Sequence, residues 1–142
     1  DEVAVIHELD YTRGAIVRSF ALGDPPLRGD FEGITHMDGY LVLTTSSGDL
    51  YLARPGHDGE RVAYRVIRTG LGRRCEIEGV EYVADQSLLY FACKTAREPG
   101  LDGTLTLLAW SPATRAEVAA RTIRIPQGAF ADLPGKGPVR PS

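Results

Sequence analysis

Two stretches of the sequence decide the fold: DFEGITHMDGYLVL at residues 30–43 and EIEGVEYVADQSLLYF at residues 76–91. Each begins acid–apolar–Glu–Gly–aliphatic and passes through a short polar segment into a second apolar run. Residues 30–34 match residues 76–80 at a constant offset of 46. A pattern repeated at this spacing predicts a structural unit of about fifty residues that occurs twice.

The remaining elements of the unit are short β-forming segments bounded by Gly, Asp or Pro, and no helical periodicity persists along the chain. The matched segments are 41–43 with 88–90 (offset 47), 48–52 with 103–107 (offset 55), and a fourth strand at 62–67 and at 118–125. Four strands per unit at this period are typical of a β-propeller blade.

The ends of the chain fit the same frame, so the expected fold is all-β, with four-stranded antiparallel blades. The predicted divisions are 1–25 (the last two strands of a preceding blade), 26–70 and 71–126 (complete blades), and 127–142 (a linker and the start of the next blade). Roughly two and a half blades are too few to close a ring of about 4 to 8. We therefore expect the rest of the propeller to come from further sequence or, as a lesser alternative, from a second copy. A complete β-sandwich would explain the strands but not the repeat.

Composition narrows the classes of partner. The 142 residues carry a net charge of −3 with no basic run, which argues against a nucleic-acid partner. No apolar stretch approaches the ~20 residues that a membrane-spanning helix needs. The start at Asp1 rather than Met indicates a processed, cloned or cropped chain, so the lack of a signal peptide carries little weight.

The Glu-Gly pairs are the leading candidates for a site. We expect Gly33 and Gly79 to lie on strands that line the propeller axis, where a missing Cβ allows close backbone approach. Strand alternation would give each blade one acidic axial face: Asp30, Glu32, Ile34 and His36 in the first, and Glu76, Glu78, Val80 and Tyr82 in the second.

Two roles for Glu32 and Glu78 remain open. Carboxylates brought together at the axis raise one another's pKa or recruit a cation, and Ca²⁺ accepts such oxygen ligands. Alternatively, each Glu accepts hydrogen bonds from backbone N–H groups of the adjoining blade and ties the ring together.

Four further residues are candidates at the same end of the axial channel. His36 is included because alternation places it on the face of Glu32, and Lys94 because it could answer a carboxylate or an anionic ligand. A packed histidine and a surface salt bridge are the plainer interpretations. Asp1 and Glu2 could add carboxylate, or could simply form a solvated terminus.

The two cysteines leave another alternative open. Cys75 and Cys93 flank a predicted hairpin that turns near residues 84–86, and they fall within a two-residue slip of direct opposition. A disulfide is geometrically conceivable, and an exported protein would permit it. The alternative is a pair of buried, reduced thiols packing as small apolar groups. Two cysteines without further Cys or His at ligand spacing do not make a zinc site.

The repeat resembles a known family, the SdiA-regulated (YjiK-like) propellers, a six-bladed bacterial group akin to NHL and esterase-like phytase propellers. The matching stretches are DEVAVIHELDYTRGAIVRSFALGD (1–24), GDFEGITHMDGYLVLTTSSGDLYLA (29–53), RRCEIEGVEYVADQSLLYFACKT (73–95) and VRPS (139–142). The resemblance implies a six-bladed ring, a periplasmic or secreted setting and calcium association. It implies no established reaction.

Two classes of function follow. The first, which we favour, is a non-enzymatic propeller module that binds a cation, a small ligand or a protein partner at its axial channel. The second is a metal-dependent hydrolase of the phytase, phosphoesterase or lactonase type, in which a central ion activates water. The sequence contains none of the common hydrolase, zinc-protease, nucleotide-binding or EF-hand motifs, and we assign no catalytic residue.

Overall fold

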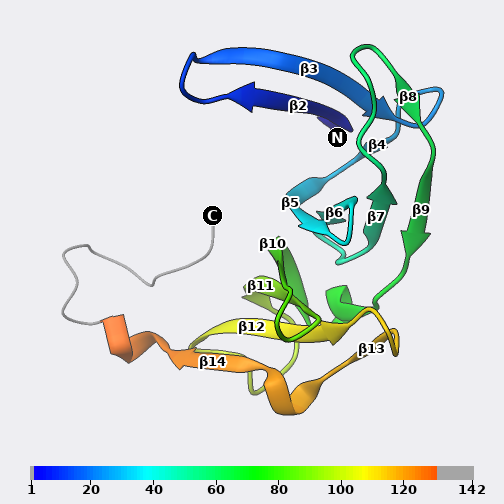
Figure 1. Ribbon diagram of the computed structural model, residues 1–142. Coiled ribbons are helices and arrows are strands. Elements are labelled where there is room, and N and C mark those ends of the chain that lie inside the picture. The colour runs from blue at the N-terminus through cyan, green and yellow to red at the C-terminus, as the bar shows by residue number, and fades with distance from the viewer. Residues whose placement is uncertain (1, 131–142) are drawn as a thin grey trace.

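The computed structural model describes residues 2–130, and within this range the chain is all-β (Figure 1). The strands are interrupted by short 3₁₀ turns, and no α-helix occurs among these residues. The turns are η1 (Leu71–Arg73), η2 (Ala119–Arg121) and η3 (Gln127–Phe130). The all-β class expected from the sequence is therefore confirmed, whereas the expectations for Asp1 and for residues 131–142, which include VRPS, lie outside the described part of the chain.

The strands form three main sheets, and none of them closes on itself within residues 2–130. The first sheet has the order β2 (Val5–Asp10), β3 (Ala15–Leu22), β8 (Arg61–Val62). The second has the order β5 (Phe31–Met37), β6 (Tyr40–Thr45), β7 (Leu50–Ala53), β9 (Tyr64–Ile67). The third joins β10 (Cys75–Val83), β11 (Leu88–Ala96) and β12 (Thr104–Ser111), and both β13 (Ala116–Glu117) and β14 (Ile123–Pro126) pair with β12. A small separate ladder pairs β1 (Glu2–Val3) with β4 (Arg28–Gly29).

The repeat extends through the hairpin between the first two strands of the second and third sheets. Ile34 pairs with Leu43, and the equivalent pair in the third sheet is Val80 with Phe91. Val80 follows Ile34 by 46 residues, whereas Phe91 follows Leu43 by 48 residues. The predicted offset of 47 for this strand is thus wrong by one residue. The cause is the turn: Asp38 and Gly39, both with positive φ (49° and 79°), form a two-residue turn, whereas four residues, 84–87, separate β10 from β11.

The predicted fourth strands are also corrected. The segment 62–67 is not one strand, because Arg61 and Val62 pair in parallel with β3 of the first sheet, and the chain then passes Ala63 into β9 of the second sheet. The segment 118–125 is interrupted by η2, so only β14 continues as a strand there. In both units the chain reaches the outer edge of its sheet by an irregular step.

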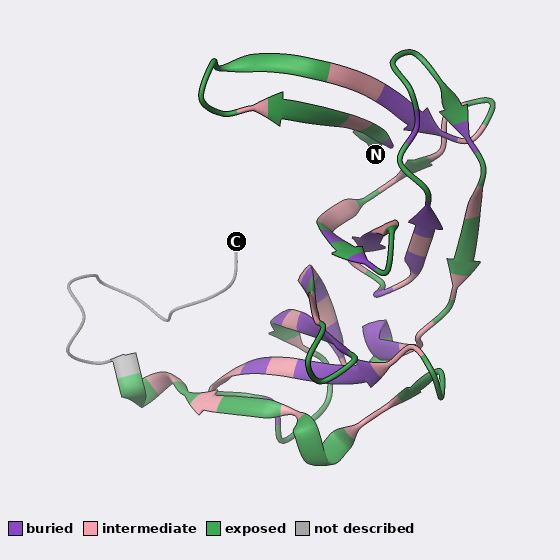
Figure 2. Cartoon of the chain, in the orientation of Figure 1, coloured by how far each residue is buried: buried purple, intermediate pink, exposed green. Residues whose placement is uncertain are grey.

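The sheets fan out around an arc, and apolar clusters lie between them (Figures 1 and 2). One cluster joins residues of the first and second sheets, including Phe20, Leu22 and Leu43. A larger cluster joins the second and third sheets, including Val42, Phe91 and Trp110, each at most 1% exposed. A third cluster is built from the third sheet itself: Leu88, Tyr90 and Ala109, with Val83, Leu107 and Val118 packed against them.

The first sheet differs from the other two. β7 and β12 are interior strands, whereas the corresponding strand β2 pairs only with β3, and its other edge meets no strand among residues 2–130. The first sheet also exposes apolar side chains, with Leu9 63% and Ile16 60% exposed (Figure 2). It therefore has an unpaired edge and an incompletely covered apolar surface.

Candidate functional site

The Glu of each Glu-Gly pair is the extra residue of a β-bulge. In the second sheet Phe31 pairs with Thr45 and Gly33 with Thr44, which leaves Glu32 without a partner residue. In the third sheet the flanking pairs are Ile77 with Cys93 and Gly79 with Ala92, which leaves Glu78 in the same position. A bulge bends its strand and redirects the side chain that it carries. The repeated motif therefore encodes a repeated backbone irregularity.

These bulges overturn the predicted faces. Ile77, Val80 and Tyr82 pair with alternate residues of β11 and so share one face, while Glu76 lies on the other. The expected common face of Glu76, Glu78, Val80 and Tyr82 is wrong. A single extra residue switches the alternation of every residue beyond it.

The same switch occurs in the second sheet. Phe31, Ile34 and His36 pair with Thr45, Leu43 and Leu41, which are alternate residues of β6. Phe31 therefore takes the place that the prediction gave to Asp30 and Glu32. His36 is exposed, and the regular alternation that linked it to Glu32 is broken between the two residues.

The two glycines occupy the point where the second and third sheets approach each other. A Cβ on Gly33 would lie 2.9 Å from both the Cα of Gly79 and the backbone nitrogen of Val80. This confirms the predicted need for close backbone approach at Gly33. Gly79 differs, since the nearest atom to a Cβ there would be the Cβ of Ala92 at 3.8 Å, an ordinary contact.

Glu78 has a cationic partner. Lys94 Nζ lies 2.5 Å from Glu78 Oε1, and the Glu78 side chain is only 7% exposed. Lys94 is itself an extra residue, on β11, because Cys93 pairs with Ile77 and Thr95 with Glu76. The hydrogen bond to Glu78 raises the pKa of Lys94, and the charges of Glu76 and Glu32 add to this effect. Lys94 therefore pairs with a carboxylate, which was one of its predicted roles.

Glu32 has no cationic partner within 4.0 Å among residues 2–130. Its pKa is raised, first by burial and then by the negative charges of Glu78 and Asp30, while Lys94 opposes the shift. The carboxyl groups of Asp30, Glu32 and Glu78 with the ammonium of Lys94 make up what we call the acidic cluster. Within it, Glu78 is paired with Lys94, whereas neither Glu32 nor Asp30 forms a salt bridge among residues 2–130.

The hydrogen bonds that link the second and third sheets depend on Thr35, Glu81 and Ser46, which the sequence did not mark as candidates. Thr35 Oγ1 donates to Glu81 Oε2 at 3.0 Å and accepts from the backbone N–H of Tyr82 at 3.2 Å. The N–H of Ile77 donates to the carbonyl of Ser46 at 2.9 Å. A signal was present, because Thr35 and Glu81 are equivalent at the offset of 46 and both are polar.

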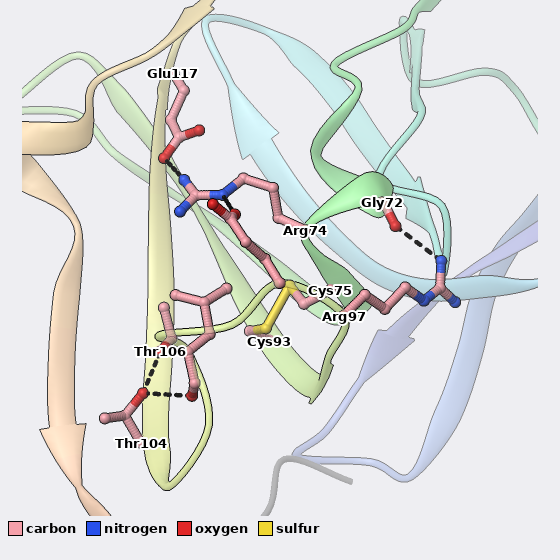
Figure 3. Close-up of a disulfide and its surroundings, with 10 residues drawn as sticks. Gly72, Arg74, Cys75, Cys93, Arg97, Thr104, Thr106 and Glu117 are labelled. Carbon is pink, nitrogen blue, oxygen red and sulfur yellow. Dashed lines mark hydrogen bonds and ion pairs between the residues drawn. A yellow bond between two sulfur atoms is a disulfide. The ribbon is translucent and has the colours of Figure 1, made fainter.

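A disulfide resolves the question left open for the cysteines. Cys75 and Cys93 are bonded, with their Cα atoms 5.7 Å apart, and both are buried (Figure 3). Beside them the Arg74 guanidinium pairs with Glu117 (Figure 3). It also pairs with Glu98, so this one side chain links three segments of the third sheet and its loops. Arg97 donates to the carbonyl of Gly72 at 2.8 Å. The strand ends next to Glu76, Glu78 and Lys94 are thereby fixed.

The fit of a metal ion can be judged from the donor set. Within residues 2–130, no three side chains of His, Cys, Asp or Glu converge closely enough to hold a metal ion by themselves. Glu2 belongs to β1 and pairs with Gly29, which precedes Asp30 in the chain. The acidic cluster thus offers carboxylate oxygens for an ion but not a complete protein cage.

Comparison with known proteins gives no match: no family, no curated protein and no solved structure resembles the chain significantly. Among the residues that the structure describes, no helix has the length and apolar character required to cross a membrane.

Proposed function

We propose that the chain is a section of a β-propeller that binds a cation at its axial end through the acidic cluster, without catalysing a reaction. The observation that carries this proposal is the state of Glu32, a partly buried carboxyl group whose pKa is raised and which has no cationic partner within residues 2–130. An added cation would relieve the repulsion from Glu78 and Asp30.

Three features support the propeller. Adjacent sheets begin with strands of the same bulged form, and these strands, β5 and β10, approach each other at their glycines. Equivalent residues of successive sheets face in the same direction along the arc, since Leu43 packs toward the first sheet and Phe91 toward the second. The unpaired edge of β2 and the exposed Leu9 and Ile16 are suited to cover by further strands. We propose a six-bladed ring of the SdiA-regulated, YjiK-like type, with which all three features are compatible.

Calcium is the cation that we propose. Ca²⁺ takes 6–8 oxygen ligands from carboxylates, carbonyls and water, so an incomplete protein cage is compatible with it. Lys94 is paired with Oε1 of Glu78. We therefore propose Glu32 as the principal ligand of the ion and Glu78 as a second ligand. Equivalent residues of further blades would complete the coordination. The Cys75–Cys93 disulfide is compatible with the periplasmic or secreted setting that we propose for the protein.

Binding is preferred to hydrolysis because of what surrounds the acids. A propeller hydrolase needs a base and cationic groups aimed at the substrate as well as a metal. Lys94 is engaged with Glu78, and the alternation that associated His36 with Glu32 is broken by the bulge. The cluster therefore offers ligands for an ion more readily than machinery for catalysis.

Calorimetric titration with Ca²⁺ tests the proposal. The wild-type protein should bind Ca²⁺ saturably, and Glu32→Gln should weaken binding on the order of tenfold. Binding should also weaken as pH falls through the raised pKa of Glu32, because a proton competes with the ion for the carboxylate.

Asp85→Asn is the matched control, since it removes one negative charge from an exposed turn residue outside the cluster. An equal loss of affinity in the Asp85 and Glu32 variants would show that the ion responds only to net charge. If the wild-type protein shows no heat of binding and no change in melting temperature on addition of Ca²⁺, the proposal of cation binding is refuted.

A further inference from the structure

A recess of about 430 Å³ lies on the outer part of the second sheet, away from the acidic cluster. It is placed where the chain steps from β8 in the first sheet through Ala63 to β9 in the second. Buried Leu52, Ala53 and Val62 lie along it, and exposed polar side chains surround it, from the segment between β7 and β9 (Arg54, Glu60 and Arg61) and from β9 (Arg65).

The charges of this recess are predominantly positive. Arg54, Arg61 and Arg65 line it, and none of the three forms a salt bridge within residues 2–130. Glu60 is the acidic residue of the lining, and its Oε2 accepts a hydrogen bond from the backbone N–H of His57 at 2.6 Å. The lining therefore has an excess of two positive charges in a chain whose net charge is −3.

Two of these arginines share one aromatic ring. The guanidinium carbon of Arg54 lies 4.6 Å from the centroid of the Tyr40 ring, and that of Arg65 lies 5.5 Å from the same centroid. Arg54 Nη2 also donates to the Tyr40 hydroxyl at 3.3 Å. The ring holds both guanidinium groups by cation–π attraction, although like charges so close repel each other. A bound anion would remove that repulsion.

We propose that this recess, built on Tyr40, Arg54, Arg61 and Arg65, binds a phosphate monoester. A guanidinium group presents a planar fork of donors that matches phosphate oxygens, and arginine is accordingly used for phosphate recognition. A phosphate monoester carries between one and a half and two negative charges near pH 7, which matches the excess charge of the lining. Arg54 and Arg65 donate hydrogen bonds to the phosphate oxygens, and the Tyr40 ring holds the two guanidinium groups in position.

The test is titration of the full chain with inorganic phosphate, followed by NMR shifts of backbone amides in β7 and β9. Arg54→Gln and Arg65→Gln should each weaken phosphate binding by about tenfold. Arg68→Gln is the matched control, because Arg68 follows β9, is 82% exposed and pairs with Asp49 at 2.7 Å outside the recess. It removes the same charge and should leave the affinity within about twofold.

Two further arms decide the class of ligand. Phosphate affinity should rise with pH as the anion acquires its second negative charge, at about pH 6 to 7. Malonate, a dicarboxylate, should bind more weakly than phosphate. Stronger binding of malonate, an equal loss in the Arg68 variant, or amide shifts that do not saturate would each overturn the assignment.

Discussion

The second unit (residues 71–126) and the first unit (residues 26–70) share a backbone plan but differ in how it is held. Both begin with a strand that bulges at a Glu before a Gly. In the second unit the bulge is bordered by a disulfide and an ion pair, Cys75–Cys93 and Lys94–Glu78. In the first unit Thr45 and Ser46 stand at the positions of Cys93 and Lys94, and Gly29 stands at that of Cys75.

This difference shows that the bulge forms without the disulfide and the Lys94–Glu78 ion pair that border it in the second unit. The first unit keeps the same bulge by packing Gly33 against the second unit and by the Thr35–Glu81 hydrogen bond. The first unit has an ion pair of its own, Arg68 with Asp49, but it lacks the covalent cross-link that borders the bulge of the second unit. Three experiments bear on this contrast.

The largest expected effect concerns the disulfide. Cys75→Ala/Cys93→Ala should lower the free energy of unfolding by about 3 kcal/mol, because a bond across a sequence separation of 18 restricts the unfolded chain. Urea denaturation monitored by circular dichroism measures this change. Each single variant should lose nearly as much as the double variant, since either one removes the same bond. Losses that simply add would contradict a linked pair.

The second effect compares the two glycines directly. Gly33→Ala should destabilise by about 1–3 kcal/mol, because its Cβ would meet backbone atoms at 2.9 Å that cannot move independently. Gly79→Ala should be neutral or stabilising by about 0.5–1 kcal/mol, since the added Cβ would make only an ordinary contact, 3.8 Å from the Cβ of Ala92, and alanine lowers the entropy of the unfolded chain. Thermal denaturation of the two variants gives the comparison. Equal losses would show that the sheets do not meet where the structure places them.

The smallest effect concerns the ion pair. Lys94→Met should raise the pKa of Glu32 further, because the ammonium of Lys94 is the group that opposes its upward shift. The folded chain then keeps a proton on Glu32 at pH values where the unfolded chain has lost it. The free energy of unfolding should consequently decrease as pH rises from the ordinary glutamate pKa through the raised one, more steeply in the variant.

An NMR titration of the Glu32 side-chain carboxyl carbon follows this pKa directly. Asp85→Asn serves again as the control and should leave the titration unchanged, since Asp85 does not contribute to the shift at Glu32. A Glu32 pKa that stays the same or falls in Lys94→Met would show that the ammonium does not act on the first unit.

The repeat made much of the fold predictable. The constant offset of 46 located β5 and β10, and the missing Cβ of Gly33 was correctly assigned to close approach. The hairpin offset was wrong by one because turn length cannot be inferred from the apolar pattern alone. A two-residue turn at Asp38–Gly39 and a four-residue turn connect strands of similar composition.

Sequence reasoning named the residues of the acidic cluster, but it placed them on the wrong strand faces. Period-two counting assumes a regular strand, and both bulges fall where the sequence shows only a Glu before a Gly. A signal did exist in the spacing of apolar residues, because 77, 80 and 82 are separated by three and then two positions. The pairing of Lys94 with Glu78 required two extra residues, one on each strand, and such coincidences are not visible one strand at a time.

The step of the chain at Ala63 means that the sequence repeat and the folded sheets do not have the same boundaries. Arg61 and Val62 close the edge of β3, which lies about forty residues earlier, before Tyr64 begins the edge of the second sheet. A gene segment cut at the boundary of the sequence repeat would leave β3 without this partner. The unit that is repeated in the sequence is therefore not the unit that folds at this point: the first sheet is completed by residues of the next unit, whereas the second sheet takes all four of its strands from its own unit.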